Sequence, residues 1–181
     1  MRVVVIGIGN PFRRDDGAGL RAAALARAAL PPGVACVESD GESSRLLDAW
    51  DGADTAILID AVRSGAPPGT VVRSEPGHRP LPDSSAGRST HDLGVGAAVA
   101  LGRALSRIPA RVVVYGIETE RDDFGPGLTS AVARGASVAA ERVVAEATTL
   151  AAAPTPVGAQ RARAPRRHGR APEDRGTAPC A

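Results

Sequence analysis

Apolar runs alternate with amphipathic stretches along the first 150 residues. Residues 2–8 (RVVVIGI), 55–60 (TAILID) and 111–118 (RVVVYGIE) are continuous, β-branched apolar runs, which is the pattern of strands buried on both faces. Residues 34–38 (VACVE) are a shorter run of the same kind. Between and after these runs, apolar positions at helical spacing and flanking turn residues predict helices over about 17–30, 45–50, 92–107 and 128–150.

This alternation predicts an α/β fold class, with a parallel sheet and helices on both faces. The connection over 61–69 is shorter than the roughly 10–12 residues that a parallel crossover needs, so residues 70–74 are expected to run antiparallel at the sheet edge. We therefore expect a three-layer α/β/α architecture with a five-stranded mixed, mostly parallel sheet. Ser43 or Ser44 is expected to cap the second helix.

Length and composition fit one domain followed by a tail. The chain has 181 residues, of which 43% are hydrophobic but only 2% aromatic, so Val, Ile, Leu and Ala have to build the core, with Trp50 and Tyr115 as aromatic anchors. From Pro154 onward, Pro, Ala, Gly and Arg dominate without periodicity, and large apolar side chains are rare. We therefore expect a single α/β domain over residues 1–150 and a disordered tail over 151–181.

The net positive charge of the chain comes from this tail. The formal net charge is +2, but six arginines against Glu173 and Asp174 give the tail a net charge of +4 and leave residues 1–150 at −2. Arginines in a Pro/Ala context without aromatic residues are typical of a solvated extension, so no nucleic-acid partner is expected. The chain contains no lysine, which excludes a Walker A phosphate loop and a Schiff-base lysine.

Cysteine content and hydropathy indicate the compartment. Cys36 and Cys180 lie far apart without a CxxC motif, which excludes a disulfide framework and favours a reducing environment. No run approaches the roughly 20 apolar residues of a membrane span, and the start of the chain is too short and too interrupted by glycine for a signal peptide. A cytoplasmic protein with no membrane attachment is expected.

Polar side chains gather where the predicted strands end. In an open α/β sheet, ligands bind beyond the carboxyl ends of the strands, so these residues are the candidates for chemistry. The candidates are carboxylates that follow the strands and one imidazole at the start of a helix: Asp15, Asp16, Asp40, Asp60, Glu118 and His91.

Asp16, Asp60 and His91 have the chemistry of a metal site. Two carboxylates and one neutral imidazole supply about two negative charges and three donors suited to a divalent transition ion with open positions. Without a cation the carboxylates would repel each other, and one would have to hold a proton. Structural roles stay open as well: Asp15 and Asp16 can cap the following helix, Asp60 can hold a turn, and a lone histidine is often structural.

The glycine-rich turn leaves a Rossmann-like dinucleotide-binding enzyme as an alternative. A strand, a Gly7-Ile-Gly9 turn and a helix are present, and Glu38 ends the second strand near the place of a ribose-binding acid. Against this, Phe12 stands in place of the third glycine, and the acidic pair before the helix would repel a pyrophosphate.

Five ordered blocks resemble one known family. They are GIGNPFRRDDGAG at 7–19, DG at 40–41, LIDAV at 58–62, STHDLG at 89–94, and VVVYGIE at 112–118 followed by GPGLT at 125–129. They resemble the hydrogenase maturation endopeptidases, which process the large subunit of nickel–iron hydrogenases, and the resemblance covers about residues 1–150. The first block carries Asp16 where some members carry Glu, and Thr119 replaces a proline that often ends the last strand motif.

The resemblance implies a reaction and a site. The family's metal-binding positions match Asp16, Asp60 and His91, which are therefore the implied catalytic and metal-binding residues. The implied reaction is one cut near the C-terminus of a nickel–iron hydrogenase large-subunit precursor, made after nickel has been inserted. The cofactor is then nickel, which the precursor itself can supply, and it would polarise the scissile carbonyl or activate a water. The precursor is the implied partner, and a monomer is expected.

Further roles remain open at this stage. Asp40 and Glu118 are the nearest candidates for a general base or a contact to the peptide backbone, and Asn10 is either an oxyanion donor or a turn residue. No HExxH helix and no Ser–His–Asp or Cys–His arrangement is present, so ordinary zinc-peptidase and acyl-enzyme mechanisms are not expected. A non-catalytic, chaperone-like domain that senses the nickel-loaded precursor without cutting it is the alternative from another class.

Overall fold

The structure is a computed structural model that describes residues 1–76 and 92–153. Its five strands form one sheet in the order β2-β1-β3-β5-β4, in which β4 pairs antiparallel with β5 and the other pairs are parallel. The antiparallel edge strand predicted from the short connection is therefore confirmed. The strands are β1 (Val3–Ile8), β2 (Ala35–Ser39), β3 (Thr55–Val62), β4 (Val71–Ser74) and β5 (Arg111–Glu118).

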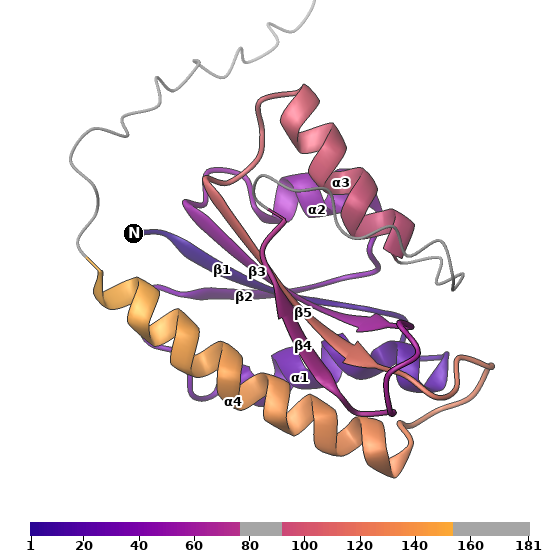
Figure 1. Cartoon of the computed structure of the whole chain (residues 1–181). Helices are drawn as coiled ribbons and strands as arrows, with labels where there is room; N and C mark the ends of the chain where they lie inside the picture. Colours follow the sequence, from indigo (N-terminus) through magenta and orange to yellow (C-terminus); the bar gives the residue numbers. More distant parts are fainter. Residues whose placement is uncertain (77–91, 154–181) are drawn as a thin grey trace, which may run out of the picture.

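The helices cover both faces of the sheet, which confirms the three-layer architecture. Figure 1 shows α1 and α4 on one face and α2 and α3 on the other. Within residues 1–76 and 92–153, no helix combines the length and hydropathy that a membrane span requires. The helices are the 3-10 turn η1 (Arg14–Gly17), α1 (Ala18–Arg27), α2 (Ser43–Ala49), α3 (Asp92–Ala104) and α4 (Ser130–Ala152).

Several element boundaries differ from the sequence prediction by a few residues. The first predicted helix is preceded by the 3-10 turn η1 and ends at Arg27, three residues before the predicted end, and α3 ends at Ala104 instead of 107. The last helix continues through Ala152, two residues into the predicted tail, since Leu150 is still buried in the core and anchors the last turn. The rest of that tail, including Cys180, lies outside the described residues.

Each face of the sheet carries its own apolar core, as alternating strand side chains require. Small side chains on α1 and α4, such as Ala22 and Ala139, pack against the strand residues of one face. Trp50 is buried in the core of the α2 and α3 face, where its Nε1 donates to the carbonyl of Arg107 (2.9 Å). Tyr115 is buried in the opposite core. Both aromatic residues are therefore the core anchors that the sequence predicts.

The predicted cap of α2 is wrong by one residue. Glu42, not Ser43 or Ser44, is the N-cap, because its backbone is extended and its carboxylate accepts from the amides of Ser44 (3.1 Å) and Arg45 (3.2 Å). The hydrogen bonds from Ser44 lower the pKa of Glu42. A glutamate can take this role because its longer side chain folds back onto the free amides of the first turn.

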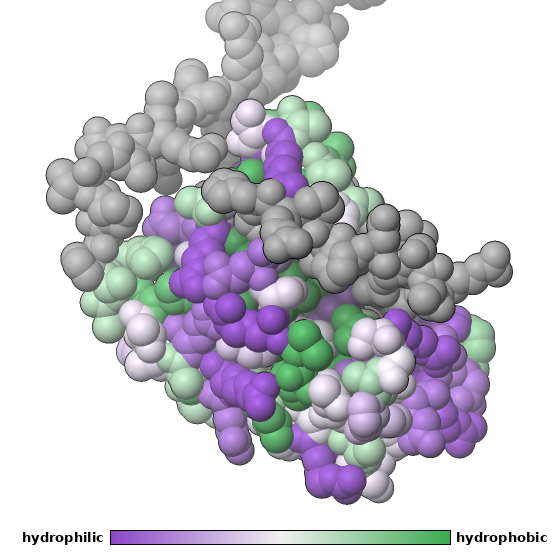
Figure 2. Space-filling model, in the orientation of Figure 1, coloured by the Kyte–Doolittle hydropathy of each residue, from purple (hydrophilic) through white to green (hydrophobic). Residues whose placement is uncertain are grey.

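A polar network joins the edge strand to α4. Arg73 bonds both Glu146 (2.7 Å) and Glu75, and Arg111 bonds Glu75 (2.6 Å), while the hydroxyl of Tyr115 donates to Glu146 (2.7 Å). Figure 2 shows hydrophilic side chains gathered over β4 and the neighbouring part of α4. Hydrogen bonds from Arg111 and Arg73 lower the pKa of Glu75 to about 2, and burial followed by the bond to Glu146 raises the pKa of Tyr115 to about 12.

This network predicts a pH-dependent contribution to stability. Glu75 and Glu146 have lowered pKa values, so the stability they add is fully present above the ordinary value of 4.5 and is lost as the pH falls toward about 2. We expect the double variant Glu75→Gln/Glu146→Gln to unfold about 3 °C below the wild type at pH 7. Thermal unfolding at several pH values should show this gap closing between pH 4.5 and 2. A gap that stays constant over this range would contradict the assignment.

Candidate active site

The sheet has its topological switch point between β1 and β3. The chain leaves β1 for β2 through α1 on one face, and it returns from β2 to β3 through α2 on the other face. The strand order reverses between β1 and β3, because the chain continues from β1 to β2 on one side of this pair and from β3 to β4 on the other. At such a reversal, open α/β sheets bind ligands in a crevice beyond the carboxyl ends of the strands. Asp16 lies in the turn η1 that follows β1, and Asp60 lies near the end of β3, so the two predicted carboxylates belong to the chain segments at this point of the sheet.

Two glycines allow the turn after β1 to lie directly against the strand ends. Gly9 has a φ of 148°, and a Cβ there would lie 2.0 Å from the carbonyl oxygen of Asp16. A Cβ on Gly19 would lie 2.2 Å from the carbonyl oxygen of Ile59 and 2.3 Å from that of Ile8. No other residue fits at these approaches. The start of α1 therefore sits on the ends of β1 and β3, which carries Asp16 to the crevice.

The structure buries both carboxylates at this edge. Asp16 is 5% exposed, and its Oδ2 accepts from the amide of Asn10 (3.0 Å), which fixes the carboxylate toward the end of β1. Asp60 is 2% exposed, and its Oδ1 accepts from the amide of Ala61 (2.9 Å). Asp60 lies two residues after Leu58 in β3, so its side chain is on the same face of the sheet as Leu58, the face that α2 and α3 cover.

His91, the third residue of the predicted triad, lies outside the described residues. The described helix α3 begins one residue later, and its first turn lies beside the loop after β2, because a Cβ on Gly94 would be 2.7 Å from the carbonyl oxygen of Gly41. Among the described residues, no group of three or more metal-binding side chains is present. Asp16 and Asp60 are thus the described part of the predicted site, and the contribution of His91 stays a prediction.

Asp15 has a structural role that sequence reasoning missed. Its fully buried carboxylate accepts from the amides of Thr129 (2.6 Å), Arg121 (2.9 Å) and Glu120 (3.2 Å) and from the Thr129 hydroxyl (3.1 Å). These donors belong to the loop between β5 and α4. The alternative that the acidic pair only caps the helix is wrong, since the N-caps of η1 and α1 are Arg13 and Gly17 and neither makes a side-chain cap bond.

Glu118 is also structural, which corrects its assignment as a candidate general base. Its carboxylate is 2% exposed and accepts from the amide of Ser64 (2.8 Å), the hydroxyl of Ser64 (2.8 Å) and the amide of Gly65 (2.9 Å). These bonds hold the turn between β3 and β4. Glu118 therefore shapes the loop after β3 through its hydrogen bonds to this turn.

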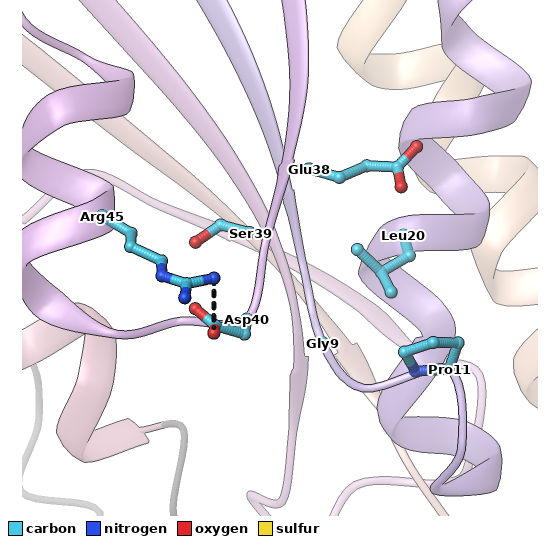
Figure 3. A pocket seen from close by; sticks show the side chains of 7 residues that line it. All are labelled: Gly9, Pro11, Leu20, Glu38, Ser39, Asp40 and Arg45. Carbon is cyan, nitrogen blue, oxygen red and sulfur yellow. Dashed lines mark ion pairs between the residues drawn. The ribbon is translucent and has the colours of Figure 1, made fainter.

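Asp40 lies on a cavity next to the crevice. It is exposed, pairs with Arg45 (3.0 Å), and accepts from the amide of Glu42 (3.2 Å). The cavity has a volume of about 300 Å³, and Figure 3 shows Ser39, Asp40 and Arg45 on one side of it, with Pro11 and Leu20 on the other. Gly9 and Glu38 complete its lining. This position fits a contact to a peptide; the catalytic role of Asp40 stays a prediction.

The turn residue alternative for Asn10 has direct support. The Oδ1 of Asn10 accepts from the amide of Phe12 (2.9 Å), which closes the turn before η1. Two residues that suggested a dinucleotide site have other partners in the structure. The carbonyl of Asp16 fills the space beside Gly9, where a pyrophosphate would approach, and Glu38, the candidate ribose-binding acid, pairs with Arg27 (3.1 Å). These contacts argue against a dinucleotide-binding role for the turn after β1.

Comparison with known proteins defines the class. Residues 22–146 match the family described as hydrogenase maturation protease, which is more than half of the chain, so the chain belongs to this family. The matched segment contains Asp60 and begins after Asp16. The sequence resemblance to this family is confirmed, as is the fold class.

Two relatives and two solved structures illustrate the similarity. The hydrogenase expression/formation proteins HupD of Thiocapsa roseopersicina and Rhodobacter capsulatus are 33% and 32% identical over 70% and 73% of this chain, and these alignments span only 58% and 64% of the relatives. The [NiFe] hydrogenase maturation protease HybD from Thermococcus kodakarensis has a TM-score of 0.66 at 29% identity, covering 81% of this chain and 99% of that one. An Escherichia coli endopeptidase has a TM-score of 0.73 at 26% identity, covering 84% and 94%.

Removal of the Asp15 carboxylate tests its structural role. In the variant Asp15→Ala, three amides that are now paired lose their buried acceptor, so we expect a loss of about 3 kcal/mol or more in the free energy of unfolding. The matched control is Asp123→Ala in the same loop, an exposed carboxylate paired with Arg14 and Arg121, which should leave the free energy of unfolding close to that of the wild type. Urea unfolding measures both. Equal losses in the two variants would show that the buried bonds carry no special weight.

Proposed function

We propose that this chain is an endopeptidase that removes the C-terminal peptide from a nickel–iron hydrogenase large-subunit precursor after nickel insertion. The proposal rests on family membership together with one observation: of two buried carboxylates, Asp16 lies in the turn that follows β1 and Asp60 lies near the end of β3, and these two strands border the switch point of the sheet. The cytoplasmic location and the monomeric state expected from the sequence belong to the same proposal.

The donor chemistry fits a divalent ion. Two carboxylates at one edge repel each other unless a cation lies between them, and carboxylate oxygens with an imidazole suit a divalent transition ion such as nickel. Asp16 and Asp60 would hold the ion together with His91, and the ion itself is part of the substrate, held by the precursor. In that position it supplies Lewis-acid polarisation of the scissile carbonyl.

The residues of the chain itself supply orientation. The amides of Asn10 and Ala61 each donate to one of the two carboxylates, and such outer bonds fix the direction in which the oxygens point. The cavity beside Asp40 provides room for an extended peptide next to the turn that carries Asp16. Recognition of the nickel-loaded precursor then depends on carboxylates that are placed before the precursor arrives, which limits the ordering cost of binding.

The non-catalytic alternative predicts a different outcome from the same mixture. A chaperone-like domain would bind the nickel-loaded precursor and leave its mass unchanged. The maturation protease description of the family favours cleavage.

A processing assay tests the proposal. Nickel-loaded and nickel-free precursor are incubated with the wild type, Asp16→Asn or Asp60→Asn, and the precursor mass is followed by mass spectrometry. Wild type should shorten only the nickel-loaded precursor. Because loss of an outer-shell partner alone typically costs 10–100-fold, each variant, which removes a direct ligand, should lower the rate by more than about 100-fold.

Asp48→Asn is the matched control for these variants. Asp48 is an exposed carboxylate at the end of α2 that pairs with Arg107, and its variant should process precursor at the wild-type rate. Binding of the precursor without any shortening would favour the chaperone alternative. Wild-type rates in both Asp16→Asn and Asp60→Asn would sink the proposed site.

A further inference from the structure

Both phenylalanines of the chain lie on its surface. Phe12 is 73% exposed and Phe124 is 76% exposed, and the sequence contains no other phenylalanine. In contrast, the single tryptophan and the single tyrosine are buried. Isolated exposed apolar side chains are common, whereas exposed aromatic side chains that gather at one place mark interaction sites.

The two phenylalanines sit on loops that are bonded to each other. The carbonyl of Phe12 accepts from the amide of Gly125 (2.9 Å), and the amide of Arg14 donates to the carbonyl of Gly125 (2.9 Å), which makes a parallel bridge at Arg13. The Arg13 guanidinium lies 5.1 Å from the centre of the Phe124 ring. Phe12, Arg13 and Phe124 thus form one surface, called here the aromatic patch.

The backbone under the aromatic patch is fixed. Asn10 accepts from the amide of Phe12, and Arg14 is held in a left-handed conformation (φ 44°) by its bond to Gly125 and by its ion pair with Asp123 (2.8 Å). The buried carboxylate of Asp15 ties η1 to the loop that carries Phe124. A surface that is ordered before binding loses little conformational entropy when a partner docks.

The aromatic patch is continuous with the candidate active site. The amide of Asp16 donates to the carbonyl of Arg13 (3.0 Å), and the carboxylate of Asp16 accepts from Asn10. One turn therefore carries the patch on its outer side and the candidate ligand on its inner side. Figure 1 shows this turn and the loop after β5 at the same end of the molecule.

Among the described residues around the patch, the ion pairs leave one cation for a partner. The neighbouring arginines are paired: Arg14 and Arg121 with Asp123, and Arg63 with Asp122. Arg13 makes no ion pair among the described residues, and its printed contact is the ring of Phe124. A guanidinium held over an aromatic face keeps its donors available for a carboxylate.

We propose that the aromatic patch docks the large-subunit precursor. This inference rests on the proposed function, because the partner is the substrate of that site. The docked surface of the precursor is apolar, covers the rings of Phe12 and Phe124, and presents a carboxylate to Arg13. The patch holds the precursor body while the cleavage segment enters the crevice, so it sets affinity and leaves the chemical step unchanged.

Binding and processing of the nickel-loaded precursor test this assignment. The double variant Phe12→Ser/Phe124→Ser should weaken precursor binding by about tenfold or more in biolayer interferometry, since aromatic anchors dominate interface energetics. The same variant should raise KM for processing by a similar factor with kcat unchanged, and Arg13→Gln should act in the same direction more weakly. Because Phe12 and Phe124 are exposed, we expect the double variant to unfold at the wild-type temperature.

Leu105→Ser is the matched control. Leu105 is 53% exposed and follows α3, about 20 Å from the start of that helix, so its variant should bind and process as the wild type does. Cleavage by the double variant with wild-type KM would contradict docking at the aromatic patch and leave the proposed function intact. If the wild type bound the precursor through the patch but never cleaved it, the proposed function alone would be contradicted. Patch-dependent association of two copies of this chain, with unchanged precursor binding, would also overturn the inference.

Discussion

The arrangement of the candidate active site depends on one buried carboxylate, that of Asp15. In the sheet order, β3 lies between β1 and β5. The hydrogen bonds of Asp15 join the turn after β1 to the loop after β5, so they bridge the end of β3, and η1 contacts that strand. Asp60 lies near the end of β3, the strand between the two that these loops follow. Backbone bonds of Phe12 and Arg14 to Gly125 also join the two loops, and the carboxylate of Asp15 adds the buried part of this connection.

The four buried acids at this edge, Asp15, Asp16, Asp60 and Glu118, differ in their hydrogen-bond partners. Asp15 and Glu118 are saturated by amide and hydroxyl donors from loops far away in sequence, so they serve the backbone. The carboxylate of Asp16 accepts from the amide of Asn10, and that of Asp60 accepts from the amide of the next strand residue, Ala61. The described bonds thus give Asp15 and Glu118 a structural role, while the chemical role of Asp16 and Asp60 belongs to the proposal.

Much of the fold could be predicted from the sequence because its signals are local. Apolar runs identified the strands, and the short connection over residues 61–69 identified the antiparallel edge. The roles of Asp15 and Glu118 depend on contacts across more than 50 residues, which local patterns do not encode. Two acids before a helix give the same pattern whether they cap it or clamp a distant loop. The predicted cap of α2 was wrong for a local reason, because the side chain of Glu42 accepts from the amides that Ser43 or Ser44 was expected to bond.

The central claim is that Asp16 and Asp60 act on one divalent ion. Nuclear magnetic resonance of the isotope-labelled chain with added paramagnetic nickel tests it directly, because the amides of Asn10 and Ala61 report on the two carboxylates. The account predicts that both amide signals broaden at the same nickel concentration, and that Asp16→Asn abolishes the broadening at Ala61 as well. Signals that stay sharp, or an Ala61 response that persists in Asp16→Asn, would contradict a shared site.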